Sequence, residues 1–122
     1  PTASLAPALT GQTDTEWGRI WDTVPADFPI YAGATEASEA ATGPTSAELA
    51  VFGSPPKRVI EWTAKELTSD GYAISGGTAP FEDGSYSIEG TGDAGCRILV
   101  TAAPLGGMTA VSILYGAECP NT

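Results

Sequence analysis

The chain has 122 residues, a hydrophobic fraction of 42% and no histidine, and its 15 Asp and Glu against 5 Lys and Arg give a formal net charge of -10. This length supports one domain with a single modest core. The charge excludes a nucleic-acid-binding protein, which would need a basic surface. The missing histidine removes the commonest general base and metal ligand. We therefore expect no catalytic residues, no cofactor and no metal ligands.

The amino-terminal region predicts a tail followed by a short helix. Residues 1–12 are rich in Pro, Ala and Thr, which is typical of a flexible tail, and residues 13–122 are expected to form the single domain. Trp17, Ile20 and Trp21 fall at positions i, i+3 and i+4. This spacing predicts a short amphipathic helix over 16–21. No apolar run is long enough for a membrane span, so we expect no membrane insertion of the mature chain.

The main helix is expected between Ser54 and Gly71. Ser54 suits the N-cap, Pro55 suits the first helical position, and Gly71 suits a left-handed residue just after the end. One face of this helix is apolar and should cover a sheet. The residues of that face are Val59, Ile60, Thr63, Ala64 and Leu67.

Segments with alternating apolar residues predict strands on both sides of this helix. Before it, residues 34–41 and 47–52 are expected to form a hairpin. After it, a strand begins at Tyr72, and the pair Asp83-Gly84 predicts a tight turn. The strand pairs that this turn predicts are Phe81 with Tyr86 and Ala79 with Ile88.

The last hairpin can be predicted residue by residue around a two-residue turn at Gly106-Gly107. The predicted pairs are Leu105 with Met108, Ala102 with Val111, Val100 with Ile113, Ile98 with Tyr115, and Cys96 with Ala117. Cys119 lies two residues past the position opposite Cys96, so a small bulge or a four-residue turn would bring the two sulfurs together. We predict this disulfide, with two buried thiols as the alternative. It indicates an oxidising location, either secreted or in the cell envelope.

These elements predict the α+β class. The expected architecture is a two-layer sandwich with a mainly antiparallel sheet in the order β-β-α-β-β-β. One main helix covers one face, and the short N-terminal helix lies at an edge. Because one helix cannot cover a wide sheet, the other face must be polar or must meet a partner.

The acidic residues of two loops have three interpretations. Glu82, Asp83, Glu89 and Asp93 cluster in the sequence, and a solvated acidic rim is the simplest reading. Oxygen ligands on loops also suit calcium, although the spacing matches no EF-hand. The third reading is a pair of carboxylates that act as acid and base.

Several short motifs resemble those of small secreted or lipid-anchored bacterial proteins. In that group a "YPGA" segment precedes a strand, a helix with an aromatic-rich centre and a "GW" strand start. The matching segments here are Phe28-Pro29-Ile30-Tyr31-Ala32-Gly33-Ala34, Val59-Ile60-Glu61-Trp62, Gly71-Tyr72 and Tyr115-Gly116-Ala117-Glu118-Cys119-Pro120. Ala32, Thr63 and Tyr72 replace a proline, an aromatic residue and a tryptophan. The resemblance implies export and an α+β fold, and it leaves the function open.

The leading hypothesis is a non-enzymatic, extracytoplasmic binding or interaction module for a protein or small molecule. Its candidate ligand or partner surface is Trp17, Trp21 and Trp62. Trp62 lies at the flank of the helix face, where contact with Trp17 or Trp21 is the structural alternative. The other hypotheses are an assembly subunit that uses the tail or a sheet edge and an enzyme that relies on carboxylates alone. We expect a monomer or a weak oligomer.

Overall fold

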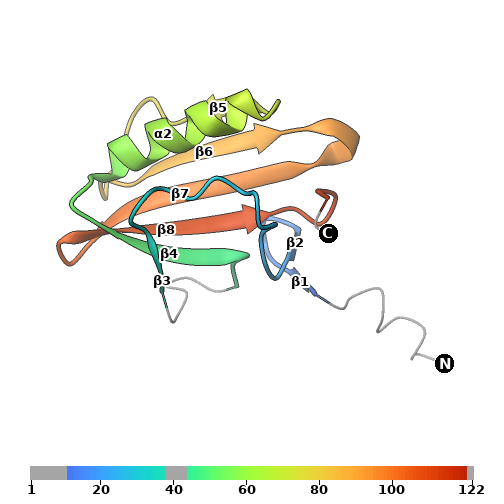
Figure 1. Cartoon of the computed structure of the whole chain (residues 1–122), viewed down its shortest axis with the longest axis horizontal. Helices are drawn as coiled ribbons and strands as arrows, with labels where there is room; N and C mark the ends of the chain where they lie inside the picture. Colours follow the sequence, from blue (N-terminus) through green and yellow to red (C-terminus); the bar gives the residue numbers. More distant parts are fainter. Residues whose placement is uncertain (1–10, 38–43, 121–122) are drawn as a thin grey trace.

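The computed structural model describes residues 11–37 and 44–120, which form two antiparallel sheets and one α-helix (Figure 1). Strands β3, β4, β8, β7, β6 and β5 form the larger sheet in that order, and β1 and β2 form a separate hairpin. The bounds are β1 Gln12–Asp14, β2 Arg19–Trp21, β3 Thr35–Glu36, β4 Ala47–Phe52, α2 Pro56–Ser69, β5 Ala73–Gly76, β6 Tyr86–Thr91, β7 Arg97–Leu105 and β8 Met108–Tyr115. The α+β class is confirmed.

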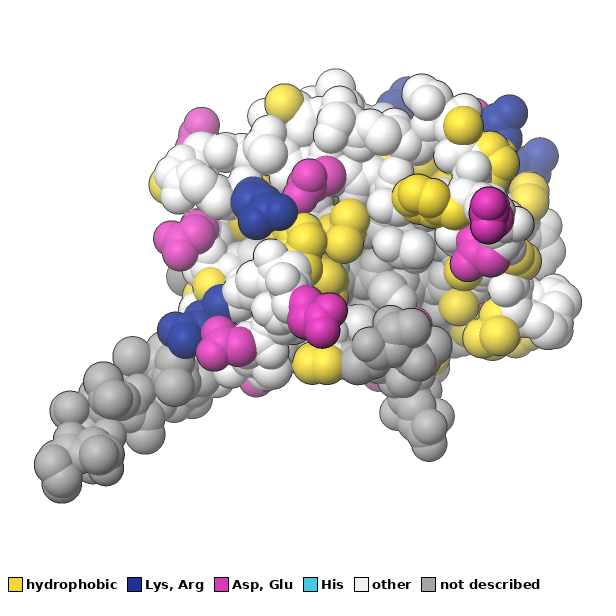
Figure 2. Space-filling model, turned by 180° about the vertical axis from the view of Figure 1, so that it is seen from behind, with side chains coloured by type: hydrophobic (Ala, Val, Ile, Leu, Met, Phe, Trp, Pro, Cys, Tyr) yellow, Lys and Arg dark blue, Asp and Glu magenta, His cyan; other side chains and the backbone are white. Residues whose placement is uncertain are grey.

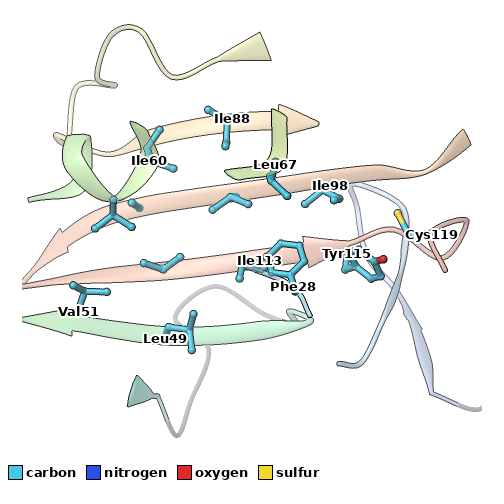
Figure 3. Close-up of a cluster of buried hydrophobic side chains, with 14 of the residues drawn as sticks. Phe28, Leu49, Val51, Ile60, Leu67, Ile88, Ile98, Ile113, Tyr115 and Cys119 are labelled. Atoms are coloured by element: carbon cyan, nitrogen blue, oxygen red, sulfur yellow. The ribbon is translucent and has the colours of Figure 1, made fainter. Parts of the chain in front are cut away.

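The hydrophobic core lies on one face of the larger sheet. Helix α2 packs across β5, β6 and β7, and the chain over 22–34 crosses the remainder of the same face (Figure 1). The ring of Phe28, from that segment, makes an edge-to-face contact with the ring of Tyr115, and the two ring centroids are 5.7 Å apart. The buried side chains come from the helix and from every second position of the strands (Figure 3). The opposite face of the sheet therefore has no helix over it among the described residues.

Helix α2 buries the predicted apolar face, because Val59, Ile60, Thr63 and Leu67 are buried. It ends at Ser69, and Gly71 is, as predicted, a left-handed residue just after the end, with a φ of 102. The Gly71 N–H donates to the Thr68 carbonyl and the Tyr72 N–H to the Leu67 carbonyl, which is the Schellman pattern. The predicted cap at the other end is wrong by one residue. Pro55 is the N-cap, and the Ser54 carbonyl instead accepts a hydrogen bond from Thr109 Oγ1 at 2.6 Å.

The last hairpin has the predicted register. Ile98, Val100, Ala102 and Leu105 of β7 pair with Tyr115, Ile113, Val111 and Met108 of β8. A tight turn follows, in which the Cys119 N–H donates to the Gly116 carbonyl at 2.9 Å. This turn brings Cys119 to Cys96, and the predicted disulfide is confirmed.

The predicted N-terminal helix over 16–21 is wrong. These residues form a turn and strand β2, which pairs with β1. Gly18 lies inside the predicted helix, but its φ of 151 is not helical and is one that other residues rarely adopt. The Thr15 hydroxyl accepts the backbone N–H groups of Trp17 and Gly18, which closes the turn. Of the predicted tail, residues 1–10 lie outside the described residues, and Gln12 belongs to β1.

Two further predictions on the sheet are wrong. Four strands follow the helix instead of three, so the order in the larger sheet is β-β-α-β-β-β-β. Ile88 pairs with Gly76 and not with Ala79, because β5 ends at Gly76. Gly76 and Gly77 both have positive φ, and Pro80 lacks a donor, so the chain leaves the sheet before the Asp83-Gly84 turn. The Phe81 backbone bonds within the turn, where its N–H donates to the Ser85 carbonyl and its carbonyl accepts the Gly84 N–H.

The hairpin that was predicted before the helix is present in part. Strand β4 matches the predicted segment over 47–52 and pairs with β3, which has only two residues. Part of the predicted turn, residues 42 and 43, lies outside the described residues.

Candidate ligand-binding face

We call the face of the larger sheet that points away from helix α2 the open face. It carries a strip of apolar side chains. Along β7 and β8, three of the four pairs that point to this side are apolar and one is small and polar. These pairs are Leu99–Leu114, Thr101–Ser112, Ala103–Ala110 and Leu105–Met108. Phe52 of β4 extends the strip beside Met108 and is 69% exposed, and Leu105 is 51% exposed.

A hollow of about 890 Å³ lies over this strip. Its floor is Leu99, Ala103, Ala110 and Leu114, with Thr101 and Ser112 between them. The loop of the β1–β2 hairpin lines one part of the hollow, and Asp83 and Ser85 line another. Figure 2 shows this side of the molecule, with hydrophobic side chains in the middle and acidic side chains around them. The hollow is broad and open to solvent in that view, which suits an extended surface of a ligand.

Trp17 fixes the β1–β2 hairpin to the open face. Its indole Nε1–H donates to Glu89 Oε2 at 3.3 Å, and the Arg97 guanidinium lies over its ring at 4.4 Å from the centroid. Arg97 Nη2 also donates to Glu89 Oε2 at 2.8 Å. The Arg97 hydrogen bond is the main cause that lowers the pKa of Glu89, and the bond from Trp17 adds to it. Three side chains from three segments thus hold this side of the hollow.

Two other carboxylates of the hollow differ in their surroundings. Glu48 lies half buried in the floor, where the Ser112 hydroxyl lies 3.1 and 3.0 Å from its two oxygens. Burial raises the pKa of Glu48, although the bond from Ser112 opposes the shift. Asp83 is exposed and accepts the Ser85 hydroxyl at 2.6 Å and the Ser85 N–H at 2.9 Å. These bonds lower the pKa of Asp83, so it stays ionised in mildly acidic solution.

The charge of the hollow is acidic throughout. Its lining contains Asp14, Glu16, Glu48 and Asp83 and no basic side chain among the described residues. The five basic side chains of the protein are elsewhere or already paired. Arg19 pairs with Asp14 at 2.7 Å and Arg97 with Glu89, whereas the other three, Lys57, Arg58 and Lys65, lie on α2.

The structure places the three predicted tryptophans in three different contacts. Only Trp17 lines the hollow. Trp21 donates its indole N–H to the Cys119 carbonyl at 2.7 Å and packs against the core. Trp62 makes an edge-to-face contact with Tyr31, with ring centroids 5.4 Å apart, and its expected contact with Trp17 or Trp21 is wrong. The segment over 27–34 lies between the helix and the sheet edge, and this placement was not expected.

A second hollow of about 590 Å³ lies near the disulfide. Tyr115 is at its base, and its hydroxyl donates to the Pro120 carbonyl at 2.6 Å. Burial raises the pKa of Tyr115 far above its usual range, so it remains a neutral donor. The Tyr115 hydroxyl of this hollow is already bonded within the chain, and we regard the open face, with its apolar floor, as the stronger candidate site.

The predicted acidic cluster is divided between two places. Glu89 faces Trp17 and Arg97 on the open face and Asp83 lines the hollow there, whereas Glu82 and Asp93 are exposed and do not line it. Across the described part of the chain, no three His, Cys, Asp or Glu side chains are grouped so that they could hold a metal ion.

The protein that this geometry defines is a two-layer α+β domain with a disulfide and an open sheet face. Comparisons with protein-family models, with curated proteins and with solved structures find no match. No helix within the described ranges is long and apolar enough to cross a membrane. The sequence analysis left open whether this face is polar or meets a partner and named none of its residues as a site, although the sequence contains the signal of an apolar face. Both sets of alternate positions in 98–115 are rich in apolar residues, whereas a solvated face would be polar.

Proposed function

We propose that the protein is a non-enzymatic binding module that acts outside the cytoplasm and holds its ligand on the open face of its larger sheet. One observation carries this proposal, the hollow of about 890 Å³ with an apolar floor and acidic side chains around it. Sites for ligands are concave and mostly apolar, with a few polar groups that orient the ligand. Exposed apolar patches on a monomer mark places where another molecule binds.

The proposed location is supported by the Cys96–Cys119 disulfide, because such bonds persist in oxidising compartments. The resemblance to small secreted or lipid-anchored bacterial proteins agrees with it. The absence of histidine favours binding over acid–base catalysis. Three of the four acids of the hollow are already engaged, Asp14 in an ion pair, Asp83 in a turn and Glu48 beside a hydroxyl.

A peptide display screen on the full chain tests the proposal. We expect enriched peptides to lose binding to the variant Leu99→Thr/Leu114→Thr, which removes the apolar floor and replaces it with β-branched residues that suit a strand. The matched control is Ile30→Thr/Phe81→Thr, which removes two exposed apolar side chains elsewhere. Circular dichroism would verify that both variants fold. If every enriched peptide binds the floor variant as well as the natural chain, the open face is not the binding site and the proposal fails.

A further inference from the structure

We infer that the open face binds a basic amphipathic helix of a partner protein. This inference rests on the proposed function, because it names the class of partner for the same face. The length of the apolar strip, the small side chains in its middle and the sign of the surrounding charge lead to this partner.

The apolar strip has the length of a helix. It runs from the Leu99–Leu114 pair to the Leu105–Met108 pair. The six steps from residue 99 to residue 105 along the strand correspond to about 20 Å, and an α-helix of that length has about 13 residues. The opposite face of the same sheet is covered by α2, which has 14 residues. A second helix on the open face would give the sheet a helix on both sides.

The middle of the strip is low, so that a helix can approach the sheet closely. Thr101, Ala103, Ala110 and Ser112 are small and lie between larger side chains at the two ends. The strip is about two strands wide, which matches the narrow apolar face of an amphipathic helix. The hydroxyls of Thr101 and Ser112 lie along the strip and tolerate a polar or small side chain of the partner.

The charge around the strip favours a basic partner. Glu16, Glu48 and Asp83 line the hollow, and the basic side chains of the chain lie on α2 or in the ion pairs of Arg19 and Arg97. Lys or Arg at the flanks of a bound helix would meet these carboxylates. Complementary charge of this kind gives specificity and a faster association rate.

A second copy of the chain fits the face less well than a basic partner. Each copy carries a formal charge of -10, so two copies repel one another. The basic residues of α2 are interspersed with Glu61 and Glu66, and its outer surface is therefore nearly neutral.

Two designed peptides test the inference on the full chain. Both are amidated 14-residue amphipathic helices with Leu on one face, and the other face is Lys in one peptide and Glu in the other. We expect the Lys peptide to bind with shifts in the amide resonances of β7 and β8. Glu16→Gln/Glu48→Gln should weaken its binding about tenfold. The control Glu61→Gln/Glu66→Gln changes the net charge equally and should weaken binding less than twofold.

The outcomes separate this inference from the proposed function. Equal binding of the Lys and Glu peptides, or equal loss in the two double variants, would overturn the inference. So would display-selected peptides that depend on Leu99 and Leu114 but are neither basic nor helical, and this result would leave the proposed function intact. A dimer that forms through the open face and is abolished by Leu99→Thr/Leu114→Thr would show that the occupant is a second copy, which also overturns the inference.

Discussion

Breaking the Cys96–Cys119 disulfide is expected to lower the free energy of unfolding by about 3 kcal/mol. The bond closes a loop with a sequence separation of 23, and the chain-entropy relation for a loop of that size gives roughly 3.4 kcal/mol at 25 °C. Both cysteines are 2% exposed, and reduction leaves two sulfurs of nearly the same volume in the core. The loss should therefore come from the unfolded chain rather than from a cavity.

This loss is a large part of the stability that a domain of this size has. It should lower the melting temperature by roughly 10 to 20 °C. The effect should be concentrated at the turn after β8, because the Cys119 carbonyl accepts the Trp21 indole N–H and the Ala117 N–H donates to the Arg19 carbonyl. We therefore expect faster amide exchange in the β1–β2 hairpin, which lines the hollow.

The assay is guanidinium unfolding of the oxidised chain and of chain that was reduced while unfolded and refolded in reductant. The Cys96→Ala/Cys119→Ala variant, which has no thiols, controls for effects of the reductant itself. A thiol count must establish that reduction is complete. Equal unfolding free energies for the oxidised and fully reduced chains would refute the loop-closure argument.

Two further variants test groups of the open face. Burial raises the pKa of Glu48, so ionisation of this side chain lowers the stability of the folded protein at neutral pH. This cost disappears as the pH falls below the ordinary pKa of glutamate, where the side chain is protonated in both the folded and the unfolded chain. Glu48→Gln should thus be more stable than the natural chain at pH 7 and equal to it near pH 3. The control Glu61→Gln, which removes the same charge from α2, should gain less stability at pH 7. Denaturant titrations across this pH range measure both variants, and a larger gain for Glu61→Gln would contradict the prediction. Arg97→Met removes both the contact over Trp17 and the ion pair with Glu89, and it should cost about 1 kcal/mol. Hydrogen exchange should rise in the β1–β2 hairpin, and unchanged exchange there would contradict this role of Arg97.

Local patterns were sufficient to predict the core of this fold. The β7–β8 register follows from one Gly-Gly turn and strict alternation, and the α2 boundaries follow from proline at its start and Gly71 at its end. The N-terminal helix was mispredicted because three apolar residues at helical spacing are also compatible with a turn and a strand. Gly18 and the hydroxyl of Thr15 decide between these structures, and their effect depends on the contacts of Trp17 with the sheet.

The open face was harder to predict than the core, because it is defined by strand order. Glu16, Glu48 and Asp83 are far apart in the sequence. They line one hollow because β4, β8, β7 and β6 are adjacent in the sheet and the β1–β2 hairpin folds over it. Trp17, Trp21 and Trp62 were grouped by residue type alone. The sheet separates them. Trp62 contacts Tyr31 on the covered side, Trp21 contacts Cys119 near the chain end, and Trp17 faces the open side.

The outward positions of the last hairpin explain how an acidic protein can retain an apolar face. Its eight outward residues are Leu99, Thr101, Ala103, Leu105, Met108, Ala110, Ser112 and Leu114. None of these is charged, although charged side chains there would be solvated at little cost. A long uncharged sheet surface favours self-association. The surrounding carboxylates and the net charge of -10 oppose it, because every copy repels its neighbours. We infer that the same charges attract a basic partner, so the acidity that opposes self-association would also select which proteins reach the apolar strip.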